Sequence, residues 1–199
     1  APDCAYRNGT YYFYFPHPSE TDWNDSWKIG VATSDKPAEE FKVQGYIEGM
    51  DPMIDPCVFV DDDGQAYIYN GGGGTCKGGK LKDNMIELDG PMQAMEGLSD
   101  FHEATWIHKY NGKYYLSYSD NHDDGEKHNR MCYAISDSPL GPWNTREFTW
   151  NPPIVIPTTA LLSSSRDNGI LSITTVHCPV MIGCALSVWT NCTTIRTAL

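Results

Sequence analysis

The sequence predicts an all-β protein of the β-propeller class, and three observations support this prediction. A unit that begins with a carboxylate and continues as paired aromatic strands around an Asn-Gly or Asp-Gly turn occurs three times. The leading carboxylates Asp3, Asp55 and Glu103 are 52 and 48 residues apart. A period of about 50 residues with short paired strands is typical of propeller blades, and no segment has a useful length of helical periodicity. Because equivalent blade positions point to one central axis, the three carboxylates are expected to converge there.

The first unit is predicted to begin with a hairpin from Asp3 to Phe15, which turns at Asn8-Gly9. Asn-Gly is the preferred pair for a type I′ turn between two antiparallel strands. A third strand is expected at Trp27 to Ser34, and it ends in the segment ATSDKP. This order of elements predicts a meander of antiparallel strands.

The second unit is predicted to turn at Asp63-Gly64 and continue into YIYNG, with LKDNMIELDG supplying the outer strands. DDDGQAY resembles the start of a calcium loop but lacks the glutamate that closes one, so a hairpin turn is predicted. The glycine run 71–74 is not a phosphate loop, because no Gly-Lys-Ser/Thr follows it, and it is interpreted as a flexible loop.

The third unit is predicted to run from Glu103 through Asn111-Gly112 to YYLSYS, with a further strand at Met131 to Ser136. That strand ends in AISDSP, which repeats ATSDKP of the first unit at a distance of 102 residues, from Asp35 to Asp137. The repeat supports an internal duplication of blades.

The bulk composition excludes several function classes. A net charge of −12 and an isoelectric point near 4.7 argue against a nucleic-acid partner. No apolar stretch is long enough to span a bilayer, so no membrane partner is expected. Seven irregularly spaced Cys predict free buried thiols rather than a disulfide framework or a metal cluster, and no cofactor is required.

The chain opens inside a strand unit, so its natural start is expected upstream, and a secreted or periplasmic location is favoured.

The chain changes character after Trp143. Every Tyr and Lys precedes this residue, whereas residues 144–199 carry ten Thr and three Cys. Residues 1–143 are therefore predicted to form a partial propeller and 144–199 an atypical tail. A Thr-rich extension and a separate small domain are two explanations. The favoured one is a shift of the reading frame, because the permitted codons allow DHGSIVEFKGQWYLFYH in another frame, which continues the strand repeat.

Two carboxylates are the strongest candidates for chemistry. Asp55 lies between Ile54 and Pro56 ahead of an apolar strand, and the alternative is an exposed turn Asp before Pro. Glu103 lies among aromatic residues that would exclude water and favour its protonated form, as a general acid requires, and the alternative is a solvated strand end. Asp3 either joins them or caps the first hairpin. His122 and His128 lie in an acidic loop that could hold a metal, although a solvated polar loop is favoured.

Four segments together resemble glycoside hydrolase family 43, the five-bladed propellers that act on xylosides and arabinosides. They are APD, IDPCVFVDDDGQAYIY, HEATWIHKYNGKYYLSYS and SDSPLGPW, and they cover most of residues 1–143. The resemblance implies an inverting mechanism in which Glu103 is the general acid and Asp55 tunes its pKa and orients substrate. It also implies substrate-binding roles for Asp3, His102 and Trp106. The family's general base matches no residue of this chain and is expected upstream of Ala1.

The function predicted from this resemblance is an exo-acting β-xylosidase or α-L-arabinofuranosidase on plant hemicellulose, binding xylo- or arabino-oligosaccharides. The alternatives are a non-catalytic carbohydrate-binding fragment and a structural β-protein with incidental acids. The resemblance also implies a His near a calcium ion in the full-length protein. Its motif occurs only in the restored frame, where this chain has Thr158, Thr159 and Ala160. Exposed strand edges of an incomplete propeller predict pairing into a homo-oligomer.

Overall fold

The computed structural model describes residues 1–18, 26–120, 130–146, 160–164 and 171–175. The chain divides into two compact units, Ala1–Val155 and Ile156–Leu199. The described residues form strands and turns without an α-helix, so the all-β prediction is confirmed for them. Among these residues, no helix that could cross a membrane is found. In the second unit the described residues form one antiparallel pair, β13 (Ala160–Ser164) with β14 (Leu171–Thr175).

The first sheet is a four-stranded antiparallel meander in the order β1-β2-β3-β4. Its strands are β1 (Asp3–Arg7), β2 (Thr10–Pro18), β3 (Trp27–Ser34) and β4 (Lys42–Tyr46). Asn8 and Gly9 both have positive φ, 51° and 84°, as a type I′ turn requires. The hairpin and the third strand are confirmed at the predicted positions.

The second sheet repeats this order and corrects two predictions. Its strands are β5 (Cys57–Val60), β6 (Ala66–Gly72), β7 (Thr75–Leu81) and β8 (Gln93–Ala94). The glycine run is not a flexible loop, because Gly71 and Gly72 are buried residues of β6. LKDNMIELDG does not supply both outer strands: only its first residue belongs to β7, and Leu88 adds one isolated bridge to Leu81.

The third sheet has the order β12-β11-β10-β9. Its strands are β9 (Phe101–Tyr110), β10 (Lys113–Asp120), β11 (Met131–Ser136) and β12 (Asn144–Arg146). The predicted strand from Met131 to Ser136 is confirmed. The last strand lies beyond Trp143, so the third sheet continues three residues past the boundary that composition suggested.

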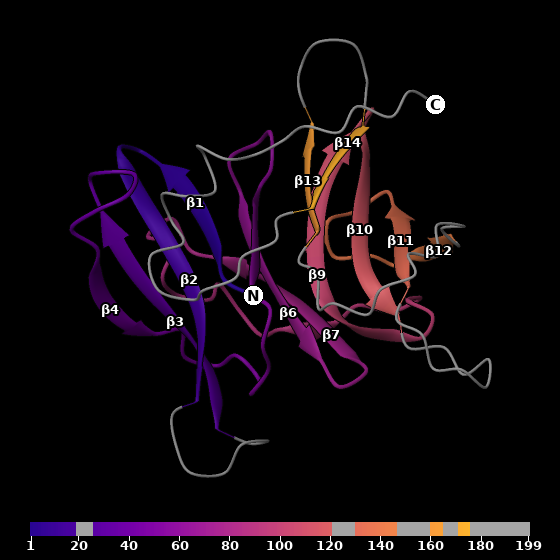
Figure 1. Ribbon diagram of the computed structural model, residues 1–199, viewed down its shortest axis with the longest axis horizontal. Helices are drawn as coiled ribbons and strands as arrows, with labels where there is room; N and C mark the ends of the chain where they lie inside the picture. The colour runs from indigo at the N-terminus through magenta and orange to yellow at the C-terminus, as the bar shows by residue number, and fades with distance from the viewer. Residues whose placement is uncertain (19–25, 121–129, 147–159, 165–170, 176–199) are drawn as a thin grey trace. The chain divides into compact units, whose positions relative to one another are not determined.

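The three sheets follow one another in sequence order (Figure 1). Their first strands are in contact, β1 with β5 and β5 with β9. Two apolar clusters join them. One contains Tyr14, Ile29, Ile68 and Met85, from the first and second sheets with the loop after β7. The other contains Tyr69, Phe101, Leu116 and Tyr118, from the second and third sheets. Burying these faces against each other is what fixes one blade on the next.

Polar contacts join the later ends of β5 and β9. Asp61 is buried and accepts a hydrogen bond from Lys109 Nζ at 2.6 Å and another from the Tyr114 hydroxyl. Burial alone would raise the pKa of Asp61, but these hydrogen bonds hold it below its usual value. The second and third sheets are therefore joined by charge as well as by apolar packing.

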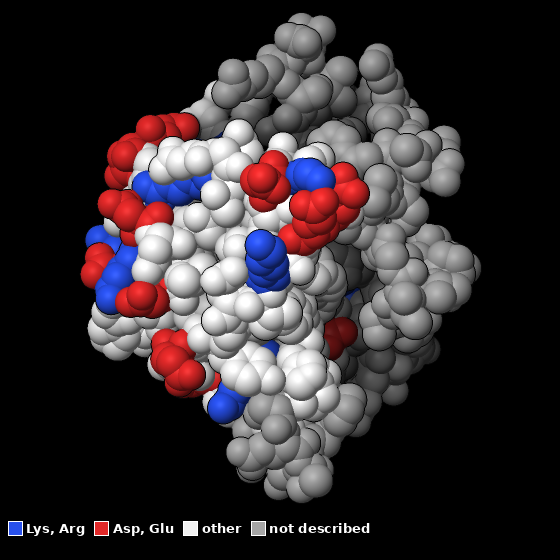
Figure 2. Space-filling model, turned by 90° about the vertical axis from the view of Figure 1, so that its left-hand side faces the viewer, with Lys and Arg blue, Asp and Glu red and all other residues white. Residues whose placement is uncertain are grey.

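The exposed side of the first unit carries both signs of charge. In Figure 2, acidic and basic groups are interspersed around an uncharged area on the side that lies at the left in Figure 1. Ion pairs of the first two sheets include Lys82 with Glu87 at 2.6 Å and Arg7 with Asp83 at 3.0 Å. On this side the net negative charge is distributed rather than gathered in one patch.

Candidate active site

Asp55 is held where the inner strands of three sheets begin. It is buried, lies two residues before β5, and has a positive φ of 51°, which is uncommon for a residue other than Gly. Its Oδ2 accepts a hydrogen bond from the backbone N–H of Ala104 in β9 at 2.8 Å. Its Oδ1 accepts a hydrogen bond from the terminal ammonium group of Ala1, the residue that leads into β1. The carboxylate therefore joins all three sheets.

Glu103 is oriented by a β-bulge. In the pairing of β9 with β10, Trp106 lies opposite Ser117 and Glu103 opposite Ser119, so β9 contains one extra residue between the two pairs. Ala104, with a φ of 64°, lies in this insertion. Bulges of this kind redirect side chains and are frequent beside active sites. Here the bulge places Glu103 on the same face of the third sheet as Trp106, away from the buried side chain of Ile107.

The Glu103 side chain is half-buried, and none of the described residues donates a hydrogen bond to it. Asp55, by contrast, has a hydrogen-bond donor on each oxygen. The two carboxyl groups are thus linked through Ala104, which follows Glu103 and donates to Asp55, and they have different surroundings. One is fixed as an acceptor and the other is available to a ligand, an arrangement that suits a proton donor and a group that orients it.

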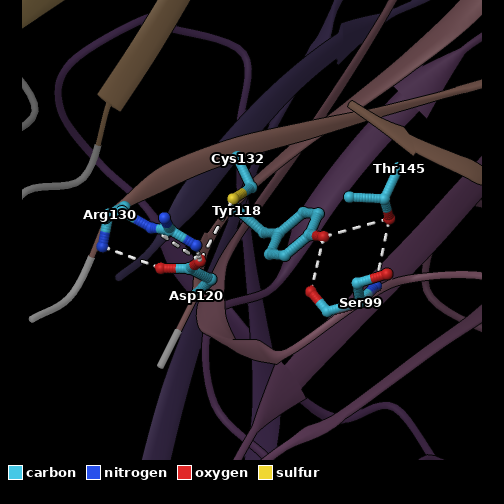
Figure 3. A network of polar contacts seen from close by, with 6 residues as sticks. All are labelled: Ser99, Tyr118, Asp120, Arg130, Cys132 and Thr145. Atoms are coloured by element: carbon cyan, nitrogen blue, oxygen red, sulfur yellow. Dashed lines mark hydrogen bonds and ion pairs between the residues drawn. The ribbon is translucent and has the colours of Figure 1, made fainter. Parts of the chain in front are cut away.

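A buried polar network supports the strand that pairs with Glu103 (Figure 3). Asp120 accepts hydrogen bonds from the backbone N–H of Arg130 at 2.9 Å and from its guanidinium Nη2 at 2.7 Å. Burial would raise the pKa of Asp120, but the hydrogen bonds from Arg130 lower it below the usual value. The Tyr118 hydroxyl donates to the Ser99 carbonyl at 2.7 Å. Residues on either side of Ser119 are therefore fixed.

Asp3 lies at the start of β1, as the repeat predicts, and its carboxylate contacts backbone. Oδ2 accepts the N–H of Val58 in β5 at 2.7 Å, and Oδ1 accepts the N–H of Cys4 at 2.8 Å. Burial raises the pKa of Asp3 to about 6, against the lowering effect of these hydrogen bonds and of the Cys57 thiol. In this structure the carboxylate joins the first and second sheets.

The two other predicted substrate-binding residues flank Glu103 along β9. His102 and Trp106 are both half-buried, and the Trp106 side chain packs against the apolar cluster between the second and third sheets. The indole N–H of Trp106 is buried and has no hydrogen-bond partner in the described part of the chain. The loop containing His122 and His128 lies outside the described residues, as do Thr158 and Thr159.

Sequence reasoning missed the bulge at Ala104 and the contacts of the glycine run. Neither Ala104 nor its neighbours carry a side chain that signals a bulge, whereas four consecutive glycines are a signal of close backbone approach. Among the described residues, no group of three His, Cys, Asp or Glu could hold a metal ion.

The chain is similar to several known proteins. A family model, glycosyl hydrolases family 43, matches residues 1–168. A xylosidase/arabinosidase of Bacteroides ovatus is 36% identical over 194 residues, which is 78% of this chain and 56% of that protein. A β-xylosidase of Xylanibacter ruminicola is 32% identical over 198 residues, covering 76% of this chain and 57% of that protein. The chain therefore spans just over half the length of these relatives.

Solved structures resemble the chain over most of its length. A β-xylosidase/α-arabinofuranosidase from a compost microbial metagenome, in complex with xylotriose, has a TM-score of 0.74 and 32% identity. The match covers 88% of this chain and 63% of that one. An enzyme of Xanthomonas citri complexed with xylotriose has a TM-score of 0.74 and 30% identity, covering 88% of this chain and 62% of that one. These neighbours are five-bladed propellers, so the three sheets described above correspond to blades.

Proposed function

Because this chain belongs to glycosyl hydrolase family 43, we propose that it is the part of a glycosidase that carries the general acid, Glu103, and its orienting partner, Asp55. The proposed substrate is a β-xyloside or an α-L-arabinofuranoside at the end of a hemicellulose chain. The names of the relatives and the xylotriose bound to two similar structures support this substrate class.

The observation that carries the proposal is the hydrogen bond from the Ala104 N–H to Asp55. It fixes a buried carboxylate beside the residue that follows Glu103, and it does so across two sheets. The fixed backbone keeps the Glu103 carboxyl group at one position, from which it can protonate a single glycosidic oxygen. A structural β-protein needs no such fixed position.

In the proposed reaction, Glu103 donates its proton to the oxygen of the scissile glycosidic bond while that bond breaks. A water molecule attacks the anomeric carbon from the opposite face and gives up its proton to a general base, so the configuration is inverted. We assign the base to a part of the longer protein outside this chain, because no residue here matches the family's motif for it. Asp55 remains an unreacting anion that holds Glu103 in position.

The experiment compares Glu103→Gln with wild type in the longest protein that the gene encodes. Glu48→Gln, at an exposed position, is the matched control. The loss of a general acid costs about 10²- to 10⁴-fold, and we expect this loss in kcat/KM on xylobiose. On 4-nitrophenyl xyloside the loss should be smaller, because nitrophenolate needs less protonation to leave. Equal losses on both substrates, or none, would show that Glu103 is not the acid.

The second candidate function is carbohydrate binding without catalysis. The chain spans just over half of its curated relatives, which favours this function for the 199-residue chain taken alone. Titration calorimetry with xylotriose and turnover assays on the same sample separate the two functions. Binding without turnover by the 199-residue chain, together with turnover by the longer protein, supports the assignment of the base to the missing part. Enzyme-like turnover by the 199-residue chain would overturn that assignment.

A further inference from the structure

Four consecutive glycines, 71–74, form the end of β6 and the turn into β7. Gly73 and Gly74 have φ values of 58° and 88°, so this is a two-residue turn in which both residues adopt the left-handed conformation. Gly71 and Gly72 pair with Cys76 and Thr75 and are buried. The turn itself explains two of the glycines, and the two strand residues require another explanation, because Gly weakens a strand.

The hairpin donates hydrogen bonds to the backbone just ahead of both candidate catalytic residues. The N–H of Gly71 donates to the carbonyl of Ile54 at 3.0 Å, and Ile54 directly precedes Asp55. The N–H of Gly74 donates to the carbonyl of His102 at 3.5 Å, and His102 directly precedes Glu103. A single rigid turn therefore contacts both segments at equivalent positions.

The space beside Gly71 is filled by an aromatic ring. A Cβ atom at Gly71 would lie 2.6 Å from Phe101 Cζ and 2.9 Å from the Thr75 carbonyl oxygen, closer than real Cβ contacts allow. Phe101 is the first residue of β9, two residues before Glu103, and its ring is buried 5.3 Å from that of Tyr118, centroid to centroid. A Cβ at Gly72 would lie 3.2 Å from Ile54 Cγ1, next to Asp55. Only glycine lets both segments approach the hairpin this closely.

We propose that the glycine hairpin 71–74 positions Asp55 and Glu103 relative to each other, with Gly71 and Gly72 as positioning residues. This inference rests on the proposed function, in which these two carboxyl groups act together. Both carboxyl groups are carried by segments that are irregular, with positive φ at Asp55 and at Ala104. Such segments hold one geometry only when their surroundings determine it. The hairpin contacts both segments and so fixes the position of one relative to the other.

The experiment compares Gly71→Ala with Gly79→Ala, the same substitution farther along this hairpin in β7. A Cβ at Gly79 would meet Met92 Sδ at 2.6 Å, and the flexible thioether can move aside. In the longest protein the gene encodes, we expect Gly71→Ala to lower kcat on 4-nitrophenyl xyloside by about 10²-fold with little change in KM, as misplacement by about 1 Å does. Gly79→Ala should stay within about twofold of wild type.

A second readout does not depend on activity. The Ala104 amide should exchange with solvent faster in Gly71→Ala, because its hydrogen bond to Asp55 is distorted, and should be unchanged in Gly79→Ala. If Gly71→Ala does not fold, Gly72→Ala replaces it, because its added methyl would lie 3.2 Å from Ile54 Cγ1 and would displace the residue that directly precedes Asp55. Unchanged Ala104 exchange, or changed exchange with wild-type kcat, overturns the positioning inference. A wild-type protein without turnover overturns the proposed function instead, and the exchange result then decides the positioning by itself.

Discussion

The carboxylate of Asp55, which leads into the second sheet, accepts a hydrogen bond at 2.8 Å from the backbone N–H of Ala104 in the third sheet. Since Ala104 directly follows Glu103, this contact transmits any displacement between the two sheets to both carboxyl groups. The geometry of the candidate site therefore depends on how the second and third sheets pack against each other.

Two replacements of Asp55 should distinguish the effect of its charge from the effect of its hydrogen bond to Ala104. In Asp55→Asn the amide oxygen can still accept the Ala104 N–H, whereas Asp55→Ala loses both charge and acceptor. We expect kcat on 4-nitrophenyl xyloside to fall in both variants, by about 10²-fold or more in the Ala variant. The exposed Asp89→Asn is the control and should keep the wild-type kcat. A wild-type kcat in Asp55→Ala would contradict the role of Asp55 as the partner that orients Glu103.

The contact of Asp3 with β5 should make stability depend on pH. Burial raises the pKa of Asp3 from 3.8 to about 6, so the folded state holds a proton that the unfolded chain releases. The resulting stability is fully present below pH 3.8 and is lost as the pH rises through about 6. Each pKa unit corresponds to about 1.4 kcal/mol, and because Asp3 is partly exposed we expect a contribution of about 1–2 kcal/mol.

Urea unfolding between pH 4 and pH 6.5 measures this contribution. The fall in the free energy of unfolding over this range should be smaller in Asp3→Asn than in wild type. The exposed Asp35→Asn should keep the wild-type dependence. If Asp3→Asn retains the full slope, the carboxylate does not titrate as the structure indicates.

Removing the hydroxyl of Tyr114 should weaken the junction between the second and third sheets. The hydroxyl donates to the buried Asp61, and hydrogen bonds to charged groups contribute about 1.5–3 kcal/mol. Tyr114→Phe keeps the ring against Phe59, so the packing is unchanged. We expect the free energy of unfolding to fall by about 1.5 kcal/mol, measured by urea titration at pH 7. Tyr110→Phe, whose side chain is exposed, should have almost no effect; equal effects of the two would refute the assignment.

Asp120→Asn should destabilise the third sheet. It removes the buried carboxylate charge with which the Arg130 guanidinium forms an ion pair at 2.7 Å. Removing one partner of a buried ion pair costs about 3–5 kcal/mol, and because Arg130 is partly exposed we expect about 2–3 kcal/mol. The pKa of Asp120 is held below 3.8, so this stabilisation is present above that pH and is lost as the pH falls through the folded-state pKa. Wild type and variant should therefore converge in stability in acid.

Asp137→Asn, in an exposed pair with Lys113, is the control and should change stability by less than about 0.5 kcal/mol. A difference that persists at pH 2 would exclude this ion pair as its cause.

The strands were predictable from sequence because each has a local cause. Asn-Gly pairs specify type I′ turns, and alternating aromatic residues specify strands with one buried face, so β3 and β11 have the predicted bounds. The glycine run was misjudged for the opposite reason. Glycine is permitted in a flexible loop and in a crowded backbone contact alike, and only the ring of Phe101, thirty positions along the chain, distinguishes them.

The positions of Asp55 and Glu103 in the fold were predictable from sequence, and their contacts were not. Asp55 and Glu103 follow from the period of the repeat, since equivalent positions in successive blades lie near one another. Asp3 and Asp55 accept hydrogen bonds from backbone N–H groups of neighbouring sheets, and the residue types of the donors, Val58 and Ala104, give no sign of these bonds. Any residue other than Pro has such a donor, so sequence patterns cannot identify which one is used.

Because β9 contains a bulge, the side of the sheet on which Glu103 lies depends on the number of residues between Glu103 and Trp106. Along a regular strand, odd and even positions face opposite sides, and Glu103 is an odd number of residues from Trp106. The extra residue at Ala104 changes that parity, so the two side chains share a face. Insertion or deletion of one residue between them therefore moves the carboxyl group to the other side of the sheet and leaves every chemical group of the site intact. A chain altered in this way retains each residue by which the family is recognised, but its acid faces the packed interior.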